Sequence, residues 1–290
     1  MFSRASIASL VEELLRRSVV NVPRDVVKAL KDALRKEDGE IARIQLKAIL
    51  ENIGIARSKK VPVCQDTGIP LFFVKVGSKS NASIDDIYNG IVEGVKKASK
   101  DIPLRPNVVD PISRKNSGNN TGIEMPCVNF SFVPGSRSVE ITVMPKGAGS
   151  ENMSALKMLK PSEGVSGIKR FVLETVAKAS GNPCPPTIIG VGIGGSSDLV
   201  MSLAKKAALR PLGVKNKDKA LSAFEKDLKE SINSLGVGPM GLGGRTTCLA
   251  VHIEKAGCHT ASLPVGINVQ CWTGRRAAMR VTGKKVEWLS

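Results

Sequence analysis

The sequence predicts a mixed α/β (α+β) fold, in which a helical N-terminal part packs on a mixed helix–sheet domain. Apolar residues recur at helical spacing up to about residue 58, and strand-like runs, turns and glycine-rich loops join the helices from there on. Of the 290 residues, 42% are hydrophobic, which is enough for a sizeable core. No linker or repeat divides the chain. We therefore expect one domain over residues 1–290, with a helical part at 1–58 and a mixed part at 59–290.

Amphipathic helices open the chain. The first carries Ile7, Val11 and Leu14 on one face. Pro23 suits the start of a second helix, because its fixed backbone angle matches the first helical turn. A third pattern of helical spacing runs over residues 40–53. These helices are expected to form a small bundle or layer.

Local periodicity also predicts the elements of the mixed part. Amphipathic helices are expected at residues 84–100, 166–180, 197–209 and 218–234. Strands are expected at residues 70–77, 187–195, 247–253 and 262–272, the second of them entering a glycine turn. The run VNFSFVPGSRSVEITVMP reads as two strands around a Pro-Gly turn, which predicts a β-hairpin.

The net charge of +17 favours anionic partners, such as nucleic acid, an acidic protein or a small dianion. The basic residues are spread along the whole chain, and there are only one tyrosine and two tryptophans. The aromatic stacking platforms of single-strand binders are therefore largely missing. This pattern favours a solvated basic surface or an acidic protein partner over nucleic acid.

Cysteine usage and hydropathy predict a cytoplasmic protein without a membrane segment. No apolar run approaches the roughly 20 residues of a membrane span. The N-terminus lacks the apolar block of a signal peptide. In a reducing compartment the six cysteines are expected to be thiols or metal ligands rather than disulfides.

The glycine motif GVGIGG, residues 190–195, matches the dinucleotide pattern G-x-G-x-x-G between a strand and a helix. A dinucleotide fold needs a second strand that ends in an acidic residue about 20 positions later. No apolar strand precedes Asp218, so NAD binding is not supported. The motif instead predicts a tight turn that allows close backbone approach.

The two histidines exclude a histidine-rich metal site. His252 and Glu254 form an H-x-E, but the P-C-x-x-C half of a zinc deaminase is absent. His252 lies within a strand-like run and is expected to be structural. His259 follows a glycine and a cysteine in a loop before the last predicted strand, where a functional and a structural role are both open.

Three of the six cysteines share a setting of Pro, Gly or polar neighbours at the edge of an apolar run: Cys64, Cys184 and Cys271. Turns at such places leave a thiolate reachable. The other three are expected to be packing residues: Cys127, Cys248 and Cys258. Scattered thiols without tight spacing leave inert packing and a metal site both open.

Eight ordered blocks identify a resemblance that covers nearly the whole chain from about residue 5. They are VCQDTGIP, RPNVVDP, SGNNTG, PKGAGSENMS, LKPSEG, NPCPPTIIGVGIGGSSD, GPMGLGGRTT and HTASLPVGINVQCW. The chain resembles the alpha subunit, or equivalently the N-terminal domain, of class I iron–sulfur fumarases and the related L-tartrate dehydratases. The resemblance implies a hydro-lyase, most directly one that interconverts fumarate and (S)-malate. L-tartrate dehydratase is the alternative, and a non-catalytic iron–sulfur or nucleic-acid-binding protein is the alternative of another class.

The resemblance implies a [4Fe–4S] cluster held by Cys64, Cys184 and Cys271. A cluster normally takes four thiolates, so three protein ligands leave one iron open. An open metal position is what Lewis-acid catalysis requires. The iron would polarise the C–O bond that is made or broken.

Further site residues are implied by the same resemblance. Gln65 and Asp66 would line the substrate site, and Arg105 would bind a substrate carboxylate through its planar guanidinium. Asp66 and His259 would tune or relay the C3 proton. From the residues alone, Asp66 is a turn residue and Arg105 part of a surface salt bridge.

The chain departs from the family at Lys146-Gly147-Ala148-Gly149, where three consecutive glycines are usual. Ala148 would keep the backbone contact to the substrate but narrow the approach. The remaining substrate anchors lie in the beta portion of the family, so the resemblance implies a beta subunit, an α2β2 assembly and a dicarboxylate substrate. Arg275 and Arg276 could face the substrate, the partner or only solvent.

Overall fold

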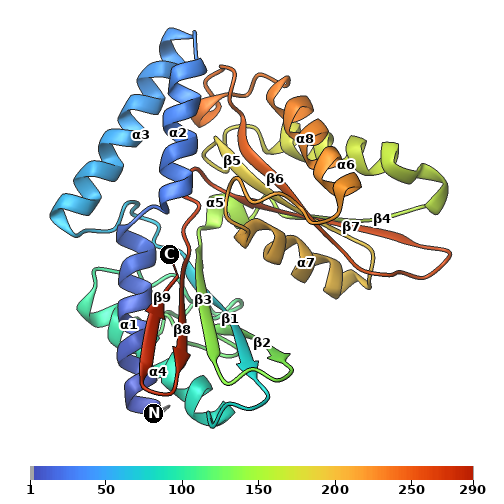
Figure 1. The fold of residues 1–290 in the computed structure, drawn as a ribbon. Helices are drawn as coiled ribbons and strands as arrows, with labels where there is room; N and C mark the ends of the chain where they lie inside the picture. Colours follow the sequence, from blue (N-terminus) through green and yellow to red (C-terminus); the bar gives the residue numbers. More distant parts are fainter. Residues whose placement is uncertain (1–2, 290) are drawn as a thin grey trace. The chain divides into compact units, whose positions relative to one another are not determined.

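The structure, a computed structural model, describes residues 3–289. The chain divides into two compact units (Figure 1). Unit 1 contains residues 3–23, 53–147 and 275–289, and unit 2 contains residues 24–52 and 148–274. Each unit has its own sheet and helices, which confirms the mixed α/β class. The single domain expected over residues 1–290 stays a prediction.

Unit 1 is built on a five-stranded sheet. Its strands are β1 (Ile69–Gly77), β2 (Cys127–Val133), β3 (Val139–Lys146), β8 (Ala277–Thr282) and β9 (Lys285–Trp288). Their order is β2-β1-β3-β8-β9, and the β1–β2 pair is parallel while the other pairs are antiparallel. The sheet therefore joins residues from the middle and from the C-terminal end of the chain.

The predicted hairpin between β2 and β3 is wrong. The two strands exist, but β1 lies between them and pairs with both. The reason is burial: β1 is the most apolar run of this sheet, and its backbone groups are satisfied on both sides only at an interior position. β2, which is largely exposed, takes the edge.

Two helices pack on one face of this sheet, α1 (Arg4–Val20) and α4 (Ile84–Asp101). Leu14 and Ile91 are fully buried with Phe72, Ile141 and their neighbours in one core. Two glycines of α4 let α1 approach closely. A Cβ added at Gly94 would lie 2.7 Å from the carbonyl oxygen of Ala8. The helices were expected from the sequence, and both are confirmed.

Unit 2 is built on a four-stranded sheet of order β4-β7-β5-β6. Its strands are β4 (Ala155–Leu159), β5 (Thr187–Ile193), β6 (Cys248–Lys255) and β7 (Leu263–Gln270). Its helices are α2 (Arg24–Lys36), most of α3 (Glu40–Lys59), α5 (Ala148–Glu151), α6 (Gly164–Ala179), α7 (Ser197–Leu209) and α8 (Lys219–Asn233). Two 3₁₀ turns lie at Pro161–Glu163 and Pro239–Gly241.

Helices cover both faces of the unit 2 sheet, and β5 shows why. Ile189 and Val191 point to one face, where they share a core with α6 and α8. Gly190 and Gly192 point to the other face, where a Cβ at either would lie 2.1 Å from a carbonyl oxygen of α7. Because large side chains alternate with glycines along β5, α7 packs closer to the strand than the helices on its other face do.

The glycine turn after β5 confirms the interpretation of GVGIGG as a close-approach turn. Gly194 has φ +84°, and its N–H donates to the carbonyl of Pro264 at 2.9 Å. A Cβ at this position would lie 2.1 Å from the carbonyl oxygen of Ala256. The motif thus joins β5 to the loop between β6 and β7.

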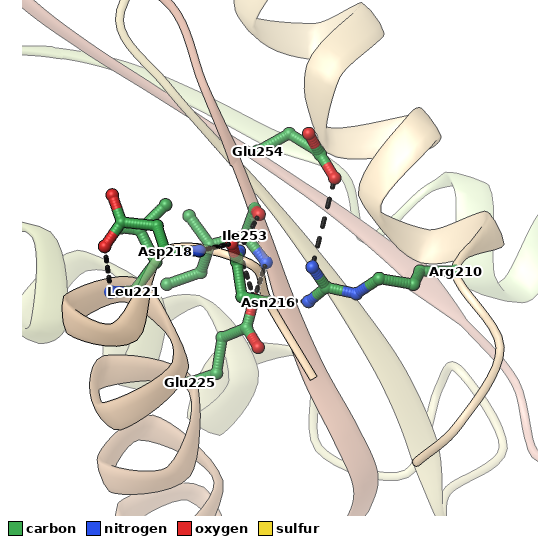
Figure 2. A network of polar contacts seen from close by, with 7 residues as sticks. All are labelled: Arg210, Asn216, Asp218, Leu221, Glu225, Ile253 and Glu254. Carbon is green, nitrogen blue, oxygen red and sulfur yellow. Dashed lines mark hydrogen bonds and ion pairs between the residues drawn. The ribbon is translucent and has the colours of Figure 1, made fainter. Parts of the chain in front are cut away.

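A buried carboxylate ties α8 to β6 (Figure 2). Glu225 accepts hydrogen bonds from the backbone of Ile253 at 2.8 Å and from the Asn216 amide at 3.0 Å, and it forms an ion pair with Arg210. Figure 2 also shows Asp218, whose carboxylate caps the first turn of α8. Because the charged oxygen is paired and hydrogen-bonded, its burial is tolerated.

In residues 3–289 no helix combines the length and hydropathy that a membrane crossing needs.

Candidate active site

Asp66 occupies the loop between α3 and β1. Its Oδ1 accepts a hydrogen bond from the N–H of Gly68 at 2.9 Å, which is the turn geometry expected from the sequence. The same oxygen accepts from the amide of Asn107 at 3.1 Å, in a loop far along the chain. Asp66 is therefore both a turn residue and part of a polar cluster between two loops of unit 1.

Arg275 closes this cluster from the C-terminal side. Its side chain is buried, and Nη1 donates to the backbone carbonyl of Asp66 at 2.7 Å. A Cβ at Gly147 would lie 3.0 Å from Asp66 Oδ2 and 3.2 Å from Arg275 Nη2. The glycine therefore lets a carboxylate and a guanidinium sit close to the backbone. Arg276 is buried as well, so the solvent alternative for the arginine pair is wrong.

Arg105 is held next to the Asp66 turn by its backbone. Its N–H donates to the hydroxyl of buried Thr67 at 3.0 Å. The Arg105 side chain is exposed, and in the described part of the chain it forms no ion pair with a carboxylate. The surface salt bridge considered from the sequence is therefore not found among these residues. An exposed guanidinium beside a fixed turn is suited to a small carboxylate ligand.

A second asparagine, the buried Asn120, supports the loop around Asn107. The N–H of Asn107 donates to Oδ1 of Asn120 at 2.7 Å, and Asn120 is buried with φ +59°. The blocks RPNVVDP and SGNNTG are thus one structural unit. Sequence reasoning did not single out Asn107, and it left Arg275 open. The available signals were an asparagine two residues after Arg105 and an arginine pair that begins four residues after the predicted ligand Cys271.

Cys64 and Gln65 lie in the same loop, directly before Asp66, and both are exposed. Cys64 is a free thiol, so nothing covalent blocks a metal ligand role. The loop therefore presents a thiol, an amide and a carboxylate in three consecutive positions.

In unit 2 the structure brings Cys184 and Cys271 to the same end of one sheet. Cys184 comes just before β5, and Cys271 directly follows β7, which runs antiparallel to β5. The N–H of Trp272 donates to the carbonyl of Cys184 at 3.1 Å, so the two cysteine loops are hydrogen-bonded to each other. Trp272 is itself buried at this end of the sheet.

The Cys184 loop is supported by a second motif. The N–H of Met240, in the block GPMGLGG, donates to the carbonyl of Pro185 at 2.8 Å. A Cβ at Gly241 would lie 2.5 Å from the Cα of Gly181, so the two backbones touch. Cys184 itself has φ +54° and is half-buried. The strained position is held by contacts on both sides of the cysteine.

Among the described residues, no three His, Cys, Asp or Glu side chains form a ready metal site. The donor chemistry fits an iron–sulfur cluster nevertheless, because two half-buried cysteines lie in hydrogen-bonded loops at one sheet end and a third cysteine is exposed in unit 1. The full set of three cysteine ligands stays a prediction.

The remaining cysteines differ from one another. Cys248 is fully buried in β6, where burial raises the pKa of its thiol to about 12, and the packing role is confirmed. Cys127 is half-buried at the start of the edge strand β2. Cys258 was expected to pack, but it is exposed, because the loop between β6 and β7 turns outward from the sheet.

Comparison with known proteins decides the family. A sequence model described as fumarate hydratase (Fumerase) matches residues 8–280. A "Putative L(+)-tartrate dehydratase subunit alpha" of Methanocaldococcus jannaschii is 55% identical over 277 residues, which cover 95% of this chain and 97% of the relative. An "L(+)-tartrate dehydratase subunit alpha" of Escherichia coli K12 is 35% identical over 260 residues, covering 90% of this chain and 86% of the relative.

The chain belongs to the fumarate hydratase (Fumerase) family.

Two further positions matter in this member of the fumarate hydratase family. Ala148 is exposed at the first residue of the short helix α5, directly after Gly147. His259 is exposed in the loop between β6 and β7, and its Nδ1 accepts a hydrogen bond from the N–H of Ala261 at 3.1 Å. The other histidine, His252, is buried in β6, in keeping with a structural role. Hydratases and dehydratases add water to their substrates or remove it, so a member of this family is a chain of a hydro-lyase.

Proposed function

We propose that the chain is the alpha subunit of an iron–sulfur hydro-lyase that interconverts fumarate and (S)-malate. The observation that carries the proposal is that the loops of Cys184 and Cys271 are hydrogen-bonded to each other at one end of the unit 2 sheet, in a chain of the fumarate hydratase family. We further place the enzyme in the cytoplasm, where its six cysteines stay reduced.

Cys64, Cys184 and Cys271 would hold a [4Fe–4S] cluster. When bound, the cluster supplies a Lewis acid at the iron without a cysteine ligand, which polarises the C–O bond of the substrate. The remaining steps belong to side chains of this chain and of its partner.

Arg105 binds one substrate carboxylate through its exposed guanidinium, and Gln65 lines the same site beside it. Ala148 supplies a backbone contact. Asp66 takes part in transfer of the C3 proton, because Asn107 and the Gly68 N–H fix its carboxylate in place while Arg275 clamps its backbone. His259 relays the C3 proton with Asp66. The positive net charge attracts the dianionic substrate.

The partner is a beta subunit, and the assembly is α2β2. The relatives at 55% and 35% identity are both named subunit alpha, which implies a second kind of chain in those enzymes. The beta subunit supplies the remaining carboxylate anchors and the base.

L-tartrate is the second candidate substrate, because the relatives carry the name L(+)-tartrate dehydratase. Both substrates are four-carbon dicarboxylates with a hydroxyl next to a carboxylate. The product would be oxaloacetate in place of fumarate.

The decisive experiment is anaerobic reconstitution of the chain with iron, sulfide and the beta subunit from the same genome. We expect turnover of (S)-malate and fumarate to exceed that of L-tartrate. Preferred turnover of L-tartrate would assign the second substrate. No turnover of either by a complex with an intact cluster would overturn the enzyme, and salt-dependent binding to duplex DNA would then support the nucleic-acid alternative.

The ligand set has its own test. Replacing Cys64, Cys184 or Cys271 by serine, one at a time, is expected to lower the bound iron and sulfide and to abolish turnover. Cys127→Ser is the control, since Cys127 is half-buried like Cys184 and Cys271 but lies in a strand. Loss of iron in the control alone would contradict the assignment.

A further inference from the structure

A buried threonine hydroxyl lies against the sulfur of Cys271. Thr273 follows Cys271 by two residues, and its Oγ1 lies 2.9 Å from Cys271 Sγ. While the sulfur is a thiol, either group can donate the hydrogen bond between them. A thiolate has no proton to give, so in a metal-ligating Cys271 the hydroxyl of Thr273 is the donor and the sulfur is the acceptor. The proposed ligand role therefore fixes the direction of this bond.

A tight turn holds Thr273 beside Cys271. The N–H of Gly274 donates to the carbonyl of Cys271 at 3.0 Å, which closes a four-residue turn over residues 271–274. Gly274 has φ +50°, and a Cβ there would lie 2.8 Å from the side chain of Ile188 in β5. The turn is therefore anchored at its start by the Cys184 loop and at its end by close packing on β5. Thr273 lies between these two anchors.

The hydroxyl of Thr273 is shielded from water. The exposed fraction of Thr273 is 2%, and that of the preceding Trp272 is 7%. A hydrogen bond in such a site is electrostatically stronger than one in water, and a buried hydroxyl needs a partner. The sulfur of Cys271 is the partner that the structure gives it. Valine would fill nearly the same space without the hydroxyl, so packing alone does not call for threonine here.

We propose that Thr273 is a positioning residue for the cluster ligand Cys271. The inference rests on the proposed function, in which Cys271 holds a [4Fe–4S] cluster together with Cys64 and Cys184. The hydroxyl holds the Cys271 sulfur in one direction, as residues behind a metal ligand commonly do. It also offsets negative charge on that sulfur. Because this charge is larger when the cluster is reduced, the hydrogen bond raises the reduction potential of the cluster.

Redox titration tests the proposal in the complex reconstituted with the beta subunit. Thr273→Val removes the hydroxyl and keeps the shape of the side chain, whereas Thr273→Ser keeps the hydroxyl. We expect Thr273→Val to lower the reduced-to-oxidised ratio at a fixed potential about 10-fold, a shift of about 59 mV for one electron. Thr273→Ser is expected to stay near the wild-type potential. Dithionite supplies the electrons, and the electron paramagnetic resonance signal of the reduced cluster measures the ratio.

Iron release to a ferrous chelator under anaerobic conditions is the second measurement. Thr273→Val is expected to release iron about 10-fold faster, because losing a residue that orients a metal ligand typically costs about 10- to 100-fold in metal affinity. Thr187→Val is the matched control, since Thr187 is also 2% exposed and lies in the same unit. Its hydroxyl donates at 3.3 Å to the carbonyl of Thr247, which keeps the N–H of Thr187 as a partner at 2.9 Å. The control should change neither quantity.

The potential separates a positioning role from a merely structural one, which would speed iron release alone. A loaded Thr273→Val complex with the wild-type potential would overturn the proposal, as would an equal shift in Thr187→Val. If circular dichroism shows that Thr273→Val does not fold, Thr273→Ala is compared with Thr273→Ser. These two side chains differ by one oxygen, and equal potentials would overturn the proposal.

Failure of the proposed function is distinguishable from failure of this inference. If the wild-type complex binds no cluster, the proposed function fails, and the role of Thr273 is overturned with it. If the wild-type complex binds a cluster whose potential the hydroxyl does not change, the proposed function stands and only the role of Thr273 is overturned.

Discussion

At the scale of single residues, the cysteines show how position sets chemistry. Cys248 is enclosed by the unit 2 core, whereas Cys64 and Cys258 are exposed in loops. Burial disfavours the thiolate, so the pKa of Cys248 rises to about 12. The thiolate is the form that reacts with alkylating reagents and binds metals. Burial therefore separates reactive cysteines in loops from an inert one in the core.

We expect native-state alkylation to separate these groups. With iodoacetamide at pH 8, Cys64 and Cys258 should react, while Cys248 should not, since a thiol of pKa about 12 is only about 0.01% ionised there. Raising the pH to 10 should increase labelling of the exposed thiols and still leave Cys248 unmodified. Peptide mass mapping measures the labels. Denaturant should make all six react, and rapid native labelling of Cys248 would contradict its burial.

At the scale of elements, β5 and α7 illustrate packing that depends on absent side chains. Gly190 and Gly192 face α7 at a distance that no Cβ permits. The strand was predicted from its apolar run and the helix from its periodicity, and the helix bounds match residues 197–209. The sequence also predicted a turn with close approach. It did not show which helix the glycines face.

Gly192→Ala is expected to destabilise unit 2. The new Cβ would lie 2.1 Å from the carbonyl of Val200, so α7 must move away from β5. The expected loss is about 2–3 kcal/mol of unfolding free energy, measured by urea denaturation. Gly54→Ala in α3 is the control: nothing lies within 4 Å of its Cβ, and helix propensity predicts a small gain of about 1 kcal/mol. Equal stability of Gly192→Ala and wild type would contradict the packing.

The strands that the sequence missed are short. β4, β8 and β9 have five, six and four residues, and β4 is largely exposed. Strands of this length carry little periodic signal. The hairpin between β2 and β3 failed for a different reason, since pairing depends on β1, which lies more than fifty residues earlier in the chain.

At the scale of the whole molecule, neither unit is a continuous stretch of chain. Unit 1 takes its N-terminal helix, its central strands and its last two strands from three separate segments. β8 pairs with β3 and contributes Ala277, Met279 and Val281 to the unit 1 core. Unit 1 therefore depends on residues 275–289 at the C-terminal end of the described chain.

Ending the chain at residue 274 is expected to unfold unit 1. The truncation removes three buried side chains, the clamp of Arg275 on Asp66 and the ladder partner of β3. The loss of several kcal/mol is comparable to the stability of a typical domain. Circular dichroism and thermal melting measure it. A chain that ends at Thr282 keeps β8 and should stay folded, and native-like melting of the shorter chain would contradict this dependence.

The family, the mixed α/β class, most helices and the candidate residues could be predicted from the sequence alone, because local periodicity and the eight ordered blocks each lie within a short stretch of chain. The tertiary structure decided what depends on distant segments. It placed Cys184 beside Cys271, buried Arg275 against Asp66, put Asn107 on the Asp66 carboxylate and separated His259 from the cysteine end of its own sheet. Strand order sets these distances. It depends on which strands need hydrogen-bond partners for their backbone groups on both sides, and that is a property of the assembled sheet rather than of any one segment.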